Sequence, residues 1–345
     1  MPLDIEFHLP FPSAVSPDGD TAEVHTIAWL LDYGLLRNEA EAQYLKAMRL
    51  GEAAARWFPE ARGDDLNLAC DYNALISMVN DQVDSAAGQR AEQAKAICND
   101  LLDLFRSNHQ IEPTTPYGAA WCDLWKRQAD GMSPAWQARH LRNTEAFIGS
   151  WLDDERIHRT FSSIERYMER RLIANSGEHA YLSLAERVGH YEVPEQVLAS
   201  PLIQQLIEEA IKFSLLPNDV YSAEREESRG ETDNILLVIE HATGCTRAQA
   251  VADVQAMVQD ASERFLLLET EVPRLCDTLA LIPPERAAVT ALIRAARYIG
   301  RGCYDWERAG TARYDPRGAA LAIATGYADS PQVGDDNDHD GVSLA

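Results

Sequence analysis

Residues 218–226 carry the sharpest chemical pattern in the sequence, Asn-Asp-Val-Tyr-Ser-Ala-Glu-Arg-Glu. On a helix, the spacing of Asn218, Ser222 and Glu226 puts their side chains on one face with slight drift. An amide oxygen, a hydroxyl and a carboxylate on that face form an oxygen-only ligand set, which suits Mg²⁺. A polar helix face in contact with water has the same spacing, so the pattern alone leaves both interpretations open.

A second polar cluster, Asn-Asp-Gln-Val-Asp at residues 80–84, follows an apolar helical run that ends at Val79. Asn80 and Asp84 share a helix face. A metal-binding rim above an apolar pocket needs such a cluster at the end of an apolar helix. A helix that simply emerges into water has the same composition, so this cluster also allows two interpretations.

Two pairs of residues that contain arginine stand out in an acidic chain, Arg170-Arg171 and Arg313-Tyr314. An arginine can bind a phosphate group through two hydrogen bonds, and a tyrosine hydroxyl can add another. Taken singly, each pair is more often a partner in surface ion pairs, and the nearby Trp306 is more often a packing residue.

These side chains need helices to position them, and helix signals recur while strand alternation is nearly absent. Ser200 with Pro201 predicts a helix start, Thr246 with Gln249 predicts a capping box, and Pro283 predicts the start of a last long helix. We therefore expect an all-α fold.

Two further local predictions concern helix geometry. Asp20 with Glu23 predicts a capping box for an early helix, with an apolar face made of Val24, Ile27, Ala28 and Leu31. Pro217 predicts a break that lets the turn containing residue 218 begin afresh.

Composition limits the classes of function. The chain has 345 residues, 31 Lys and Arg against 55 Asp and Glu, a net charge of −24 and 46% hydrophobic residues. Such an acidic chain does not bind nucleic acid or an anionic membrane by charge alone, and an anionic substrate needs clustered arginines or a metal ion. The six cysteines form no zinc-binding pattern. We see no secretory signal and no membrane span, and we expect a cytoplasmic protein.

Three segments are expected. Residues 1–18 form an N-terminal strap or arm, residues 19–325 form one helical domain, and residues 326–345 form a disordered acidic tail rich in Gly, Asp and Ser.

In this order, the motifs resemble one family, the bacterial class I terpene synthases (terpene cyclases). Residues 218–226 match the family's second metal motif, NDxxSxxxE, at every defining position, and residues 80–84 lie where the family has its aspartate-rich DDxxD motif. Arg171 lies at about the family's distance upstream for the pyrophosphate-sensing arginine. Arg313-Tyr314, with Trp306 before it, matches the C-terminal RY pair. The resemblance spans residues 8 to 316.

The resemblance implies a single-domain α-helical bundle around an apolar active-site cavity, in which an acyclic isoprenyl diphosphate is ionised and cyclised with release of diphosphate. A Mg²⁺ cluster, with Mn²⁺ as a substitute, would be held by Asn80, Asp81, Asp84, Asn218, Ser222 and Glu226. The diphosphate would be bound by Arg171, Arg225, Arg313 and Tyr314, of which Arg171, Arg313 and Tyr314 would be catalytic. No nucleic acid or membrane partner is implied, and a homodimer stays open.

The sequence departs from the family at Asn80, where members usually have a metal-bridging aspartate. The stretch after Arg171 is also slightly longer than usual. Asn73, Ile76 and Ser77, with Trp306, would line the pocket. Members that use the C15 farnesyl chain often have Phe at positions 76 and 77, so the smaller residues here slightly favour a C20 geranylgeranyl substrate over farnesyl diphosphate.

The sequence leaves two alternative functions open. A chain-elongating prenyltransferase shares the fold and the metals but has two DDxxD motifs, and this sequence contains one approximate copy. A non-catalytic helical binding protein derived from a cyclase would explain Asn80.

Overall fold

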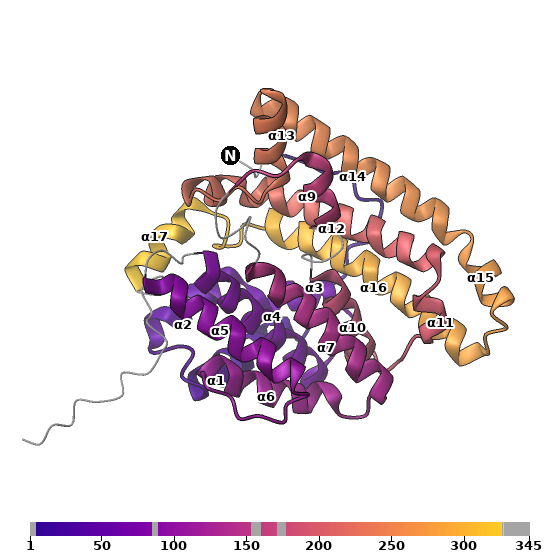
Figure 1. The fold of residues 1–345 in the computed structure, drawn as a ribbon, viewed down its shortest axis with the longest axis horizontal. Coiled ribbons are helices and arrows are strands. Elements are labelled where there is room, and N and C mark those ends of the chain that lie inside the picture. Colours follow the sequence, from indigo (N-terminus) through magenta and orange to yellow (C-terminus); the bar gives the residue numbers. More distant parts are fainter. Residues whose placement is uncertain (1–4, 85–88, 153–159, 171–176, 326, 328–345) are drawn as a thin grey trace, which may run out of the picture.

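The computed structural model describes residues 5–84, 89–152, 160–170, 177–325 and 327, and in this part the chain forms helices and loops but no strand (Figure 1). The all-α prediction is therefore confirmed. The predicted tail lies outside the described residues except for Tyr327. The helices are α1 (Gly19–Asp32), α2 (Glu39–Met48), α3 (Leu50–Trp57), α4 (Gly63–Asp84), α5 (Gln89–Arg106), α6 (Pro116–Ala129), α7 (Pro134–Gly149), the 3₁₀ turn η2 (Ser150–Leu152), α9 (Ile164–Arg170), α10 (Glu178–Val188), α11 (Glu195–Leu198), α12 (Pro201–Ser228), α13 (Ile235–Thr243), α14 (Arg247–Glu269), α15 (Val272–Thr278), α16 (Pro283–Arg308) and α17 (Pro316–Thr325).

The predicted starts of the three long C-terminal helices are confirmed. The Ser200 hydroxyl accepts from the backbone N–H of Ile203 at the start of α12. Thr246 and Gln249 form the reciprocal capping box of α14. Pro283 is the first residue of α16, where its missing N–H costs no helical hydrogen bond.

The predicted break at Pro217 is wrong, because α12 runs without interruption from residue 201 to residue 228. A proline inside a helix removes one hydrogen bond to the carbonyl four residues earlier. Here Pro217 is buried, and α12 packs along α14 on one side and α16 on another. The packing keeps the helix continuous through the proline.

The predicted face of α1 is also wrong. Val24 and Leu31 are 66% and 38% exposed, whereas Thr26 and Trp29 face the interior. The Thr26 hydroxyl donates to the buried carboxylate of Asp71, and the Trp29 indole donates to Asp123. These tertiary hydrogen bonds determine which face of α1 is buried, and periodicity cannot detect them. The predicted cap at Asp20 is absent as well, since the helix begins one residue earlier, at Gly19.

The helices form two groups joined along α16. The N-terminal group contains α1 to α7, and the C-terminal group contains α12 to α16 (Figure 1). Helix α16 packs against α12 in its own group and against α3 in the other, while α14 covers the outer side of α12. The two metal-motif segments thus lie on α4 and α12, one in each group.

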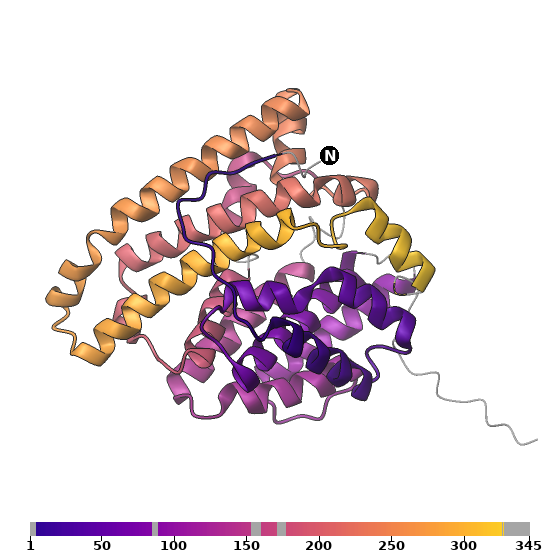
Figure 2. The ribbon, with the colours of Figure 1, turned by 180° about the vertical axis from the view of Figure 1, so that it is seen from behind.

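The segment before α1, residues 5–18, crosses the C-terminal group on the face seen in Figure 2. Phe7 and Phe11 are buried, and the Phe11 ring packs on Phe213 of α12 at 4.7 Å between centroids. Arg301 of α16 donates to the carbonyls of Leu9 and Phe11. This segment therefore ties α12 and α16 together from outside.

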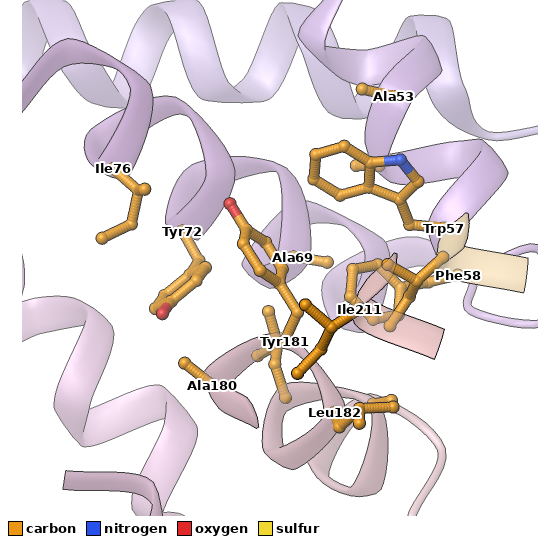
Figure 3. Packing of buried hydrophobic residues seen from close by; sticks show 14 of the residues in the cluster. Ala53, Trp57, Phe58, Ala69, Tyr72, Ile76, Ala180, Tyr181, Leu182 and Ile211 are labelled. Atoms are coloured by element: carbon orange, nitrogen blue, oxygen red, sulfur yellow. The ribbon is translucent and has the colours of Figure 1, made fainter. Parts of the chain in front are cut away.

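The centre of the molecule is rich in aromatic side chains. Figure 3 shows Trp57, Tyr72, Ile76, Tyr181 and Ile211 gathered from α3, α4, α10 and α12. The ring of Tyr181 meets Trp57 at 5.1 Å and Tyr72 at 5.3 Å, both edge to face. Such contacts hold ring orientations firmly, so the wall that these helices form is rigid.

Candidate active site

A cavity of about 180 Å³ lies between the two groups of helices. Asn80 from α4 contributes to its lining on one side, and Asn218 and Glu226 from α12 contribute on the other. Arg313, Tyr314 and Trp306 line it as well. The structure thus brings residues from three separate sequence motifs to one place.

The side chain of Asn218 is oriented by two partners. Its amide nitrogen donates to Glu307 Oε1 at 2.6 Å and to the Tyr314 hydroxyl at 2.9 Å. Since the nitrogen serves these two acceptors, the amide oxygen is the atom that Asn218 could offer to a metal ion. Burial raises the pKa of Tyr314 to about 12, so its hydroxyl keeps its proton at neutral pH. Glu307 received no role from the sequence.

Glu226 is held by Asn234, which begins α13 and is fully buried. The Asn234 amide nitrogen donates to Glu226 Oε2 at 2.8 Å and to the backbone carbonyl of Asp219 at 2.7 Å. Ser222 is 1% exposed, and it lies next to the same amide at 3.5 Å. Asn234 therefore sets the geometry of the second motif, a role that local spacing could not reveal.

Asp219, the second residue of that motif, is fully buried and faces away from the mouth. Its carboxylate accepts from the hydroxyl of Tyr167 on α9 and from the backbone N–H of Ile235 at 2.8 Å. By accepting these two hydrogen bonds, the Asp219 carboxylate joins α12 to α9 and α13, which explains why the position has a carboxylate.

On α4, two guanidinium groups meet one carboxylate. Arg225 and Arg313 donate to the two oxygens of Asp81 at 2.7 and 2.9 Å, and Arg313 also donates to Asn80 Oδ1 at 2.9 Å. The Tyr327 hydroxyl approaches Asp81 at 3.3 Å. Two guanidinium groups thus lie together at this rim, where their N–H groups can bind an anion.

For two of the predicted site residues, the structure gives no side-chain position. Arg171 lies outside the described residues, and so does the stretch that follows it up to residue 176. Asp84 is the last residue of α4, but the structure does not describe its side chain. The neighbouring Arg170 pairs with Asp233, which lines the cavity.

The donor atoms at this rim fit a hard divalent cation. Asn218, Ser222 and Glu226 offer amide, hydroxyl and carboxylate oxygens along one helix. Asn80 of α4 offers an amide oxygen that also accepts from Arg313. Among the described residues no cluster of three or more His, Cys, Asp and Glu side chains could hold a metal ion, so a site here would use this mixed set. With so few carboxylates, a cation would depend on a bound anionic substrate for further ligands.

Below the rim the cavity becomes largely apolar. Ile76, Ile211 and Tyr181 line it together with Phe147 from α7 and Trp151 from η2. The last two rings pack edge to face at 4.9 Å. Asn73 and Ser77 lie on the same wall as Ile76. The aromatic residues 147 and 151 carried no signal in the sequence, since they belong to no motif.

Two buried carboxyl groups are perturbed by their surroundings. Burial raises the pKa of Glu178, which lines the cavity, to about 8 and raises that of Glu307 to about 8. Hydrogen bonds from Ser214 to Glu178 and from Asn218 to Glu307 act in the opposite direction and are outweighed. Both groups are therefore mostly protonated at neutral pH.

Comparisons with known proteins converge on one family. Residues 71–264 match a family model described as terpene synthase family 2, C-terminal metal binding. A (−)-β-caryophyllene synthase of Saccharothrix espanaensis is 36% identical over 95% of this chain and 94% of its own length. A pentalenene synthase of Streptomyces arenae is 32% identical over 95% and 97%. A crystal structure of an α-eudesmol synthase superposes with a TM-score of 0.80 at 26% identity, covering 88% of this chain and 99% of that one.

No helix among the described residues is long and apolar enough to cross a membrane.

Proposed function

The chain belongs to the terpene synthase family and is a terpene cyclase, and we propose that it converts farnesyl diphosphate into a cyclic sesquiterpene with Mg²⁺ as the metal. The observation that carries this proposal is the meeting of the Asn80 and Asn218–Glu226 motifs with Arg225, Arg313 and Tyr314 around one cavity.

In this proposal the rim binds the diphosphate group. Arg225 and Arg313 are prepared for an anion by their shared contact with Asp81, and they exchange part of that contact for diphosphate oxygens. Tyr314 adds a hydroxyl donor. We expect Arg171 to join them. Asp81 then acts chiefly by positioning the two arginines, rather than through the metal contact expected from its place in the motif.

Asn80 and Asp84 on α4, with Asn218, Ser222 and Glu226 on α12, would hold Mg²⁺. When bound, the metal neutralises charge on the departing diphosphate and so assists ionisation of the allylic C–O bond. Glu307 and Asn234 keep Asn218 and Glu226 in place. The apolar walls below exclude water from most of the cavity, and the faces of aromatic rings such as Trp151 stabilise cationic carbon.

The sequence favoured a C20 substrate, and we propose the C15 farnesyl diphosphate instead. The expectation of a C20 substrate has no support beyond the smaller side chains of Ile76 and Ser77. Phe147 and Trp151 supply aromatic bulk to the same cavity from a different part of the chain. The printed name of the caryophyllene synthase also specifies cyclisation of farnesyl diphosphate. Both observations favour the shorter chain.

The two alternative functions lack comparable support. The two relatives reported above are named as synthases of a cyclic terpene. In addition, the convergence of Arg225 and Arg313 on Asp81 at the rim supports a working diphosphate site.

The test is diphosphate release and product analysis. Purified protein is incubated with geranyl, farnesyl or geranylgeranyl diphosphate, with Mg²⁺ or with a chelator, and volatile products are identified by gas chromatography and mass spectrometry. We expect metal-dependent release and a cyclic C15 product from farnesyl diphosphate. Products longer than the substrate would indicate a prenyltransferase, and no release from any substrate would refute the proposal.

A further inference from the structure

The apolar part of the cavity contains a polar patch that hydrocarbon binding does not need. Asn73 lies seven residues before Asn80 on α4, which puts it about 10 Å below the rim. It is 2% exposed and lines the cavity. Its amide oxygen accepts from the Tyr181 hydroxyl at 2.9 Å. With this pairing, the amide nitrogen is the end that still needs a partner.

The nitrogen of this amide is the unusual atom. Among the described residues, no acceptor lies within hydrogen-bonding distance of Asn73 Nδ2, although the atom is buried. Buried amide donors nearly always have a partner, either a protein group or an ordered water. A hydrocarbon chain in the cavity has no atom that can accept from an N–H group. A water molecule is the acceptor that fits.

A buried carboxyl group lines the same cavity. Glu178 is the first residue of α10, one turn before Tyr181, and Ser214 of α12 contacts its carboxyl group. Ser214 is four residues before Asn218 on α12, which puts Ser214 about 6 Å below the rim. Because Glu178 contacts Ser214, Glu178 lies at a similar depth, beside the hydrocarbon rather than the diphosphate. Glu178 is therefore placed to serve chemistry on carbon.

We propose that Asn73 binds a water molecule in the cavity and that this water, with Glu178 as the proton acceptor, captures the final carbocation, so that the product is a terpene alcohol. The proposal rests on the proposed cyclase function and adds the step that ends the reaction. It assigns roles to two residues that no metal or diphosphate motif includes.

A lone pair of the water oxygen forms a C–O bond to the cationic carbon, one O–H bond of the water breaks, and its proton passes to the Glu178 carboxylate. The cation and the carboxylate both become neutral. Burial raises the pKa of Glu178 to about 8, so a minor share is ionised at neutral pH, and a neighbouring carbocation increases that share. A base with a pKa near the working pH suits this transfer.

The experiment uses the full-length protein, farnesyl diphosphate and water enriched in oxygen-18. We expect an alcohol that carries the heavy oxygen. In Asn73→Leu and Glu178→Gln, the alcohol formed per diphosphate released should fall about tenfold, as for the loss of one hydrogen bond to the water, and alkenes should replace it. The matched control is Gln128→Leu. Gln128 is a fully buried amide on α6 that also lacks a partner among the described residues but does not line the cavity, so its variant should keep the alcohol fraction.

Each outcome is informative. Only hydrocarbon products from the wild type, or an alcohol without the heavy oxygen, would overturn the proposal. An unchanged alcohol fraction in both cavity variants would overturn it as well. If Asn73→Leu does not fold, Glu178→Gln alone decides, since glutamine has the shape of the protonated glutamic acid. The absence of diphosphate release from any isoprenyl diphosphate would refute the cyclase function itself, which is a separate result.

Discussion

Replacing Glu178 by glutamine should remove a large part of the pH dependence of folding stability. The carboxyl group is buried in the cavity wall, and burial raises its pKa from 4.5 to about 8. The folded state therefore holds this proton over a pH range in which the unfolded chain has released it. Since the folded state binds more protons, stability falls as the pH rises from about 4.5 to about 8 and then levels off.

The magnitude follows from the pKa shift. Each pH unit within the range costs about 1.4 kcal/mol of unfolding free energy, so between pH 5 and pH 8 this single group removes a few kcal/mol. Glutamine has nearly the same shape, can still contact Ser214 and does not titrate. In Glu178→Gln, the stability difference between the two pH values should therefore be smaller than in the wild type by a few kcal/mol.

The assay is urea denaturation of wild type and variant at pH 5 and pH 8, read by circular dichroism. Burial also raises the pKa of Glu23 and Glu307, so the wild type has other contributions, but these cancel in the comparison. Glu208→Gln, at an exposed position of α12, is the control and should change both stabilities equally. If the wild type and Glu178→Gln lose the same stability between the two pH values, the buried, protonated state inferred for Glu178 is wrong.

Four predictions concern catalysis. Glu226→Gln removes the charged ligand of α12 and should lower turnover by orders of magnitude without changing the melting temperature, so near-normal turnover would exclude Glu226 from metal binding. Asn80→Asp should lower the Mg²⁺ concentration for half-maximal activity, because a carboxylate binds a hard cation better than an amide does; an unchanged or higher requirement would mean that residue 80 is not a ligand. With competing substrates, kcat/KM for farnesyl diphosphate should exceed that for geranylgeranyl diphosphate about tenfold, or about 1.4 kcal/mol of transition-state preference. Ser77→Phe should reduce the C20 reaction further than the C15 reaction, and equal losses would place residue 77 outside the substrate cavity.

The sequence was most informative where function depends on short spacings. Asn218, Ser222 and Glu226 share a helix face because of the helical repeat, and this remains true although the helix does not break at Pro217 as expected. Helix starts at Ser200 and Thr246 were predictable for the same reason, since a cap involves only the next few residues.

The sequence was misleading where tertiary contacts outweigh local preference. The apolar stripe chosen for α1 included the exposed Val24, while the buried face is set by hydrogen bonds from Thr26 and Trp29 to aspartates on other helices. The pocket was judged from Ile76 and Ser77 alone, which made it appear open. Bulk contributed by residues on α7 and η2 could not be counted, because no rule of spacing relates them to α4.

By itself, the sequence determined that the chain is helical, that its oxygen ligands fall into two clusters, and that arginines accompany them, because composition and helical periodicity are local properties. Only the tertiary structure decided which atoms meet. Asn234 holds Glu226 across 8 residues of chain, Glu307 holds Asn218 across 89, and Arg313 reaches Asp81 across 232. Such contacts depend on how helices pack, and packing is the sum of many weak interactions over the whole core, so no short segment of sequence contains it.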